Sequence, residues 1–181
     1  MNQKLETQKK INKMENPMRK PFISKIVLSA GATGAELEKS SKLLEMLTGM
    51  KAKITKSGPR SRIPAFDVKP SMPLGAIITI RGEKALMLLK RFLGTIDNTI
   101  KENQVSNNTF SFGIKEYIDI PEIEYVREIG IRGFNVTVTF ERKGVRVKKR
   151  KIKRGKLPKK QHVTKKEIIK FMEEKFKTNF V

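Results

Sequence analysis

The segment Phe22-Ile-Ser-Lys-Ile-Val-Leu-Ser-Ala30 is the part of this chain that most constrains its architecture. It is rich in β-branched and aromatic residues and ends at Gly31, a pattern that predicts a strand closed by a turn. We expect the centre of this strand to be buried on both faces. The segments on either side must therefore supply neighbouring strands and covering helices.

Apolar periodicity and turn residues predict the elements that follow. Leu37, Leu44 and Leu47 recur at helical spacing, and Gly49 is placed to end that helix. Four prolines between residues 56 and 74 predict a long irregular loop, and long loops in compact domains are usually functional or disordered. In chain order we expect a helix at 35–48, a half-exposed strand at 50–55, the loop at 56–74, a strand at 75–81 and a helix at 83–100.

The second half of the chain adds two strands and a final helix. We expect a short strand at 110–114 and a strongly alternating one, GFNVTVTFE, at 133–141, after which residues 142–150 either continue the strand or turn back. Thr164 and Glu167 have the spacing of a capping box and predict a helix from Thr164 to Phe176. The order of elements predicts an α+β fold, with two layers in which helices pack on a mainly antiparallel sheet.

The predicted organisation has four parts along the 181 residues. We expect a flexible basic N-terminal arm at 1–15, an RNA-binding α+β domain at 16–141, a basic RNA-contacting extension at 142–163, and a C-terminal helix at 164–181 packed on the domain. The first twenty residues contain no apolar run, so neither a signal peptide nor a membrane span is expected there. The chain has no cysteine, which excludes disulfides and thiolate metal sites and favours a cytosolic protein.

The charge distribution indicates a polyanionic partner. The formal net charge is +22, and twelve of the nineteen residues from Arg142 to Lys160 are Lys or Arg, with no acid among them. Such a concentration of like charge is unfavourable unless a polyanion neutralises it, and folded nucleic acid carries phosphates densely enough to do so. A second basic group comprises Lys51, Lys53, Lys56, Arg60, Arg62 and Lys69.

Residues that might support catalysis or metal binding are few. His162 is the only histidine and has no evident acid or base partner, so a backbone or phosphate contact is the better interpretation. Gly31 to Gly34 is either a tight turn or a cradle for a backbone phosphate, because it lacks a complete nucleotide-binding motif. The acids Glu116, Asp119, Glu122, Glu124 and Glu128 fit a solvated edge or a protein-docking patch better than a metal site. We therefore expect no enzyme activity, no metal and no cofactor.

Exposed aromatic residues are scarce, which favours recognition of RNA by its backbone and shape over reading of single-stranded bases. Interleaved apolar residues, such as Val145 and Leu157, indicate that part of the basic run is structured. Composition alone leaves open a general basic architectural nucleic-acid-binding protein.

Several separate motifs resemble a universal family of large-subunit ribosomal proteins, called L-five in bacteria and L-eleven in eukaryotes. The resemblance rests chiefly on SFGIKEYIDIPEIEY at 111–125 and RGEKALMLLKRFL at 81–93. Asn16-Pro-Met-Arg, Glu45-x-Leu-Thr-Gly49 and Glu128-Ile-Gly-Ile-x-Gly133 occur in the matching order. The basic run and the helix after Thr164 resemble the archaeal and eukaryotic branch, so the chain is identified as an archaeal-type member.

The resemblance implies a cytoplasmic, ribosome-bound structural protein that binds 5S rRNA and helps attach it to large-subunit rRNA in the central protuberance, beside neighbouring proteins and away from membranes. It further implies an approach to P-site tRNA and a bridge to small-subunit ribosomal protein thirteen, for which the acids after Gly113 are candidates. Together with the charge pattern, it predicts rRNA contacts at Asn16, Met18, Arg19, Lys25, Lys51, Lys53, Arg142, Arg146, Lys148, Lys149, Arg150, Lys151, Lys153 and Arg154. The predicted tRNA-proximal residues are Arg60, Arg62, Phe66 and Lys69.

The proline-rich loop departs from the family pattern. Phe66 is kept, whereas Asp67 and Ser71 replace expected glycines and Pro64 replaces an expected arginine. These changes predict a stiffer and less basic loop.

Overall fold

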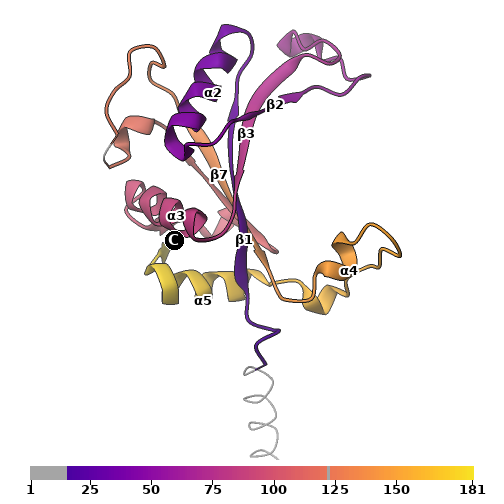
Figure 1. Ribbon diagram of the computed structural model, residues 1–181. Helices are drawn as coiled ribbons and strands as arrows, with labels where there is room; N and C mark the ends of the chain where they lie inside the picture. The colour runs from indigo at the N-terminus through magenta and orange to yellow at the C-terminus, as the bar shows by residue number, and fades with distance from the viewer. Residues whose placement is uncertain (1–15, 122) are drawn as a thin grey trace, which may run out of the picture.

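The computed structural model describes residues 16–121 and 123–181, so the predicted arm at 1–15 lies outside the described residues. A six-stranded sheet in the order β2-β3-β1-β7-β6-β5 forms one layer (Figure 1). Every pairing within it is antiparallel. The strands are β1 (Phe22–Gly31), β2 (Lys53–Lys56), β3 (Pro73–Ile80), β5 (Val105–Ser106), β6 (Thr109–Ile114) and β7 (Phe134–Glu141).

Strand β1 lies at the centre of the sheet because its apolar residues are matched on both sides. Ile26 pairs with Ile80 of β3 and with Val138 of β7, and all three are buried. Only alternate residues of β1 are fully buried, however, since Val27 and Ser29 on the other face remain partly exposed. The prediction that β1 is buried on both faces was therefore wrong, because the helices cover one face of the sheet.

The helix layer consists of α2 (Ala35–Thr48), α3 (Glu83–Thr95) and α5 (Lys165–Phe176). In Figure 1, α2 and α3 lie on the same side of β1, and α5 lies below α3. Leu44 of α2, Phe92 of α3 and Met172 of α5 are fully buried in one core cluster with the inward residues of the sheet. The predicted α+β architecture of helices on a mainly antiparallel sheet is confirmed.

Helix α3 ends at Thr95, five residues before the predicted end. Asp97 and Asn98 follow with φ of +52° and +54°, and two successive left-handed residues cannot continue a right-handed helix. The chain then forms β4 (Thr99–Ile100), which pairs in parallel with β8 (Asn179–Phe180) near the C-terminus. The prediction that this helix extends to Ile100 was therefore wrong, because Ile100 is buried in a strand.

The other boundaries differ by a few residues. Strand β2 is centred later than predicted, and β3 begins at Pro73, inside the predicted loop. Within the remaining loop, which we call the β2–β3 loop (57–72), Pro64–Phe66 forms a single 3-10 turn, η1.

After β7 the chain turns back. Gly144 has a φ of +96°, which a residue with a side chain adopts only under strain, and the short helix α4 (Arg146–Lys149) follows. The extension then returns to α5, whose predicted capping box is present, with the Thr164 N–H donating to Glu167 Oε2 at 3.0 Å.

Candidate nucleic-acid interface

The face of the sheet opposite the helices carries mainly small polar side chains. Along β7, Phe134, Val136, Val138 and Phe140 are buried, and the alternate residues between them point the other way. Register places Thr137 opposite both Val27 of β1 and Ser111 of β6. We call this surface the open face: Lys25, Val27, Ser29, Ile77, Thr79, Thr109, Ser111, Asn135, Thr137 and Thr139.

The predicted rRNA contacts near the N-terminus lie beside the extension. Met18 Cε is 3.6 Å from the position that a Cβ on Gly144 would occupy. Residues 16–19 form a turn in which the Met18 N–H donates to Asn16 Oδ1 at 3.0 Å. Met18, in the same turn as Asn16 and Arg19, thus lies close to the start of the extension, although Met18 and Gly144 are more than 120 positions apart in the sequence.

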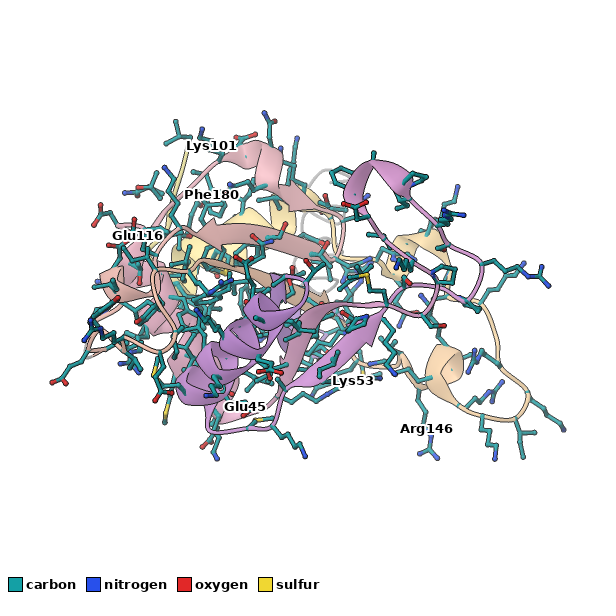
Figure 2. The ribbon with its side chains drawn as sticks, turned by 90° about the horizontal axis from the view of Figure 1, so that it is seen from above. Glu45, Lys53, Lys101, Glu116, Arg146 and Phe180 are labelled. Atoms are coloured by element: carbon teal, nitrogen blue, oxygen red, sulfur yellow. The ribbon has the colours of Figure 1, made fainter. Side chains whose placement is uncertain are left out.

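Lys25 and Lys53 extend the basic surface away from the extension. Lys25 lies on the open face, paired with Thr139, and Lys53 lies on the edge strand β2, paired with Ile77. Seen from above in Figure 2, Lys53 and Arg146 are on one side of the molecule, and Glu116 is on the opposite side. Lys101 lies nearer to Glu116 and Glu45 nearer to Lys53, so charges of both signs occur on each side in this view.

The β2–β3 loop projects from one end of the sheet, and the extension lies at the other end (Figure 1). Its predicted residues Arg60, Arg62 and Lys69 are exposed, and the Phe66 side chain is 76% exposed. Asp67 and Ser71 have φ of +51° and +60°. Both residues lie in the left-handed region, which glycine adopts freely and residues with a side chain adopt at some cost in strain.

Arg142 has a different role from the predicted one. Its side chain is only 8% exposed, and its Nη2 donates to both carboxylate oxygens of Glu167, each at 2.6 Å. Its Nη1 also donates to the carbonyl oxygen of Lys160 at 3.3 Å. This guanidinium therefore ties the two ends of the extension together and is not presented to a phosphate.

The Glu167 carboxylate is held in its charged form. Partial burial raises its pKa, but the Thr164 N–H and the Arg142 guanidinium lower it more, so the pKa lies below its usual value of 4.5. One carboxylate thus caps helix α5 and anchors Arg142. Sequence reasoning identified only the first role.

A second ion pair holds α4 against the sheet. Glu141, the last residue of β7, accepts from Lys149 Nζ at 2.5 Å and from Ser24 Oγ at 2.9 Å. Burial raises the pKa of Glu141, but the hydrogen bonds from Lys149 and Ser24 lower it by more. The net shift of the pKa is therefore downward. Lys149 is thus partly neutralised, whereas no ion pair to Arg146, Lys148, Arg150, Lys151, Lys153 or Arg154 is seen within the described part of the chain.

His162 makes side-chain and backbone contacts at the end of the extension. Asn108 Oδ1 accepts from the Val163 N–H at 2.7 Å, so the Asn108 Nδ2 group is the one that faces His162 Nδ1, at 2.6 Å. Nδ1 is then the acceptor, and the imidazole proton is on Nε2. The His162 N–H also donates to the Lys159 carbonyl oxygen at 3.2 Å.

The acidic segment after Gly113 covers the opposite side of the molecule. Its Glu128 carboxylate is 3.4 Å from Lys42 Nζ on α2, and Tyr125 is 55% exposed. Glu122 lies outside the described residues. Among residues 16–121 and 123–181, no group of three or more His, Asp or Glu is placed to hold a metal ion.

The turn at Gly31 to Gly34 connects β1 directly to α2. Gly34 has a φ of +59°, and its carbonyl oxygen accepts from the Leu37 N–H at 3.1 Å. This is the geometry of a tight turn. No helix within the described ranges is long and apolar enough to cross a membrane.

Sequence reasoning missed the open face and the anchor formed by Arg142 and Glu167. The alternation of Asn135, Thr137 and Thr139 in GFNVTVTFE was a usable signal for the first, since a strand covered on one face exposes its alternate residues. The second had no local signal, because its residues are 25 positions apart.

Comparison with known proteins adds a family to this geometry. The model of the ribosomal L5P family C-terminus matches residues 73–171, which include β3, α3, β6, β7 and most of α5. This chain belongs to the ribosomal L5P family. The motifs recognised at 81–93 and 111–125 both fall within the matched region, and the predicted family is confirmed.

Archaeal relatives cover nearly the whole chain. The large ribosomal subunit protein uL5 of Nanoarchaeum equitans is 42% identical over 164 residues, which is 89% of this chain and 96% of the relative. The protein of the same name from Methanosphaera stadtmanae is 40% identical over the same shares. That of Methanobrevibacter smithii is 38% identical over 92% of this chain and 98% of its own. The chain is thus an archaeal-type member of the family, as predicted.

Proposed function

We propose that this protein is a structural, non-catalytic constituent of the large ribosomal subunit, acting in the cytoplasm by binding folded rRNA. The observation that carries the proposal is the open face, a hydroxyl-rich sheet surface flanked by cations of β2 and of the extension, most of which have no ion-pair partner among the described residues. Its relatives are named as large-subunit proteins, which supports the same conclusion.

The chemistry of this surface suits RNA that keeps its fold. Lys and Arg neutralise backbone phosphates, while Ser, Thr and Asn hydroxyl and amide groups exchange hydrogen bonds with ribose 2′-hydroxyls and phosphate oxygens. Lys25 has one such group beside it, because its pairing partner is Thr139. A surface of this kind recognises the shape and the backbone of RNA, with little dependence on the base sequence.

The finer assignment follows the family. We propose that the open face, residues 16–19 and the extension bind 5S rRNA and help attach it to large-subunit rRNA in the central protuberance. The β2–β3 loop then approaches P-site tRNA with its exposed Phe66. The acidic segment after Gly113, whose Glu116 lies away from Lys53 and Arg146 in Figure 2, is the proposed contact for small-subunit protein thirteen.

A salt-titrated competition between 5S rRNA and duplex DNA tests the proposal. We expect 5S rRNA to bind more tightly at every salt concentration, because the open face can use 2′-hydroxyls that DNA lacks. Equal affinity for the two would favour the runner-up, a general basic architectural protein, and would overturn the ribosomal assignment.

A pair of charge-matched variants tests the surface itself. Thr79→Glu places a carboxylate on the open face, and Asn103→Glu places one at an exposed position in the turn after β4. We expect the first to weaken 5S rRNA binding at least tenfold more than the second, since only the first lies between bound phosphates. Equal losses would show that the open face is not the RNA surface.

A further inference from the structure

A pocket of about 450 Å³ lies between the extension and the end of the sheet. Its walls come from the turn before β6 with Asn108, the end of β7 with Thr139 and Glu141, α4 with Lys148, and the returning chain with Leu157 and His162. The ion pairs Arg142–Glu167 and Lys149–Glu141 hold these walls in place. The volume is in the range of pockets that accept small organic ligands.

The charges of the pocket select an anion. Its only acid is Glu141, whose carboxylate already accepts from Lys149 and Ser24. Arg142 is bound to Glu167, so the cations left for a ligand are Lys148 and Arg154, neither of which has an ion-pair partner among the described residues. Two unpaired cations at the mouth of one pocket suit a phosphate.

The interior suits a planar, hydrogen-bonding group. Val145 and Leu157 are half-buried and provide apolar walls. His162 presents its Nε2–H as a donor because Asn108 fixes its Nδ1 as an acceptor. A nucleobase has a flat apolar surface and polar edges, and in RNA it is attached to a phosphate. A nucleotide can therefore contact both the apolar walls and the cations, whereas an isolated anion can contact only the cations.

From this geometry we infer that the extension pocket holds one nucleotide unstacked from the bound RNA, with its phosphate on Lys148 and Arg154 and its base between Val145 and Leu157 toward His162. The inference rests on the proposed rRNA binding and adds a specific subsite to it. Unstacked nucleotides of loops and bulges are the parts of folded RNA whose bases protein side chains can reach. The pocket would thus fix the position of the extension on its RNA.

A charge-neutral filling variant is the first test. Leu157→Trp narrows the pocket without changing the charge, and Ile152→Trp adds the same ring at a position that is 75% exposed and does not line the pocket. With 5S rRNA and large-subunit rRNA as probes, we expect Leu157→Trp to weaken binding to one of them about tenfold with an unchanged salt slope. Equal RNA binding by the wild type and both variants would overturn the nucleotide subsite. That result would also be obtained if the pocket bound an acidic peptide in place of RNA.

Matched charge variants give a second test. Lys148→Gln with Arg154→Gln removes two pocket cations, and Lys151→Gln with Lys156→Gln removes two from the same extension outside it. We expect about tenfold greater loss of affinity for the pocket pair, and equal losses would overturn the inference. A wild-type protein that binds neither RNA would instead contradict the proposed function.

Photocrosslinking of the wild-type protein avoids dependence on the folding of variants. rRNA containing 4-thiouridine or 6-thioguanosine is bound, irradiated and digested, and the crosslinked peptides are identified by mass spectrometry. We expect a base attached to residues 157–162 and that same nucleotide to be unpaired in chemical probing. Crosslinks confined to the open face and to the exposed residues of α4 would overturn the inference.

Discussion

The two basic segments of this molecule, the β2–β3 loop and the extension, differ in charge density and are held by different interactions. The loop carries three Lys or Arg in sixteen residues, whereas the run from Arg142 to Lys160 carries twelve in nineteen. The loop closes on itself: Ser57 N–H donates to the Met72 carbonyl oxygen at 2.8 Å, and Ser57 Oγ donates to that of Lys69 at 2.7 Å. The extension is tied to the body by Arg142–Glu167 and Lys149–Glu141. The loop can therefore move as a unit, whereas displacing the extension requires breaking ion pairs.

This difference has a functional consequence under the proposed role. A segment anchored to the body holds its cations in fixed positions, so less conformational entropy is lost on binding RNA. A loop closed only on itself can adjust to a ligand that comes and goes, as P-site tRNA does. Stability and RNA affinity should thus be coupled in the extension and independent in the loop.

The largest effect is expected from breaking the anchor. Glu167→Ala leaves the buried Arg142 guanidinium without its partner. Because the Glu167 side chain is itself 43% exposed, we expect a cost of about 1 to 2 kcal/mol, below the roughly 3 kcal/mol of a fully buried pair. Urea denaturation should show this decrease in the free energy of unfolding. Glu173→Ala, an exposed position on the same helix, is the control and should change it by less than about 0.5 kcal/mol.

A double substitution separates the cost of an orphaned charge from the value of the pair. Arg142→Met with Glu167→Met removes both charges, and an apolar replacement of a buried pair is often neutral. We expect stability to recover by at least half of the loss in Glu167→Ala. If the double variant is as unstable as the single one, the orphaned guanidinium is not the cause.

The next effect is on the salt dependence of RNA binding. Replacing Lys148, Lys149, Arg150 and Lys151 with Gln should reduce the slope of log affinity for 5S rRNA against log salt by about 3, since each phosphate contact contributes about 0.7 to 0.9. Replacing Arg60, Arg62 and Lys69 of the loop with Gln should leave that slope unchanged. An unchanged slope in the first variant would mean that the extension makes no phosphate contacts.

Acidification should loosen the extension before the loop. The pKa of Glu167 is depressed in the folded state, so its contribution is present above the usual value of 4.5 and is lost as the pH falls through the lower, folded value. Thermal unfolding of wild type and Glu167→Gln, measured from pH 7 to pH 3, should show a difference that shrinks below about pH 4.5. A difference that stays constant over this range would contradict the role of the charged carboxylate.

Much of the fold could be predicted because its signals are local. Alternation in β7 and the capping box at Thr164 each depend on residues close in the sequence, and both elements are observed where expected. The end of α3 could not be predicted, because the parallel pairing of β4 with the C-terminal β8 determines it. A pairing between residues 80 positions apart does not change the apolar periodicity of either segment, so the sequence pattern near residue 100 does not indicate it.

The candidate site was predictable in composition but not in geometry. Charge alone identified the extension, and the rRNA contacts assigned to its exposed residues stay predictions. The charge pattern also suggested an rRNA contact at Arg142. This residue lies within the same basic run but is buried against Glu167. The division of the chain into arm, domain, extension and C-terminal helix likewise stays a prediction.

The smallest effect concerns strain in the loop. Ser71 has a φ of +60°, a conformation that glycine adopts at no steric cost, so Ser71→Gly should stabilise the protein by about 0.5 kcal/mol. Ser61→Gly is the control, because Ser61 is not among the positive-φ residues and a glycine there should destabilise by a similar amount. Because the loop closes on itself, neither substitution should change 5S rRNA affinity. A change in affinity with Ser71→Gly would show that the loop and the rRNA surface are coupled, and the contrast between the two basic segments would then fail.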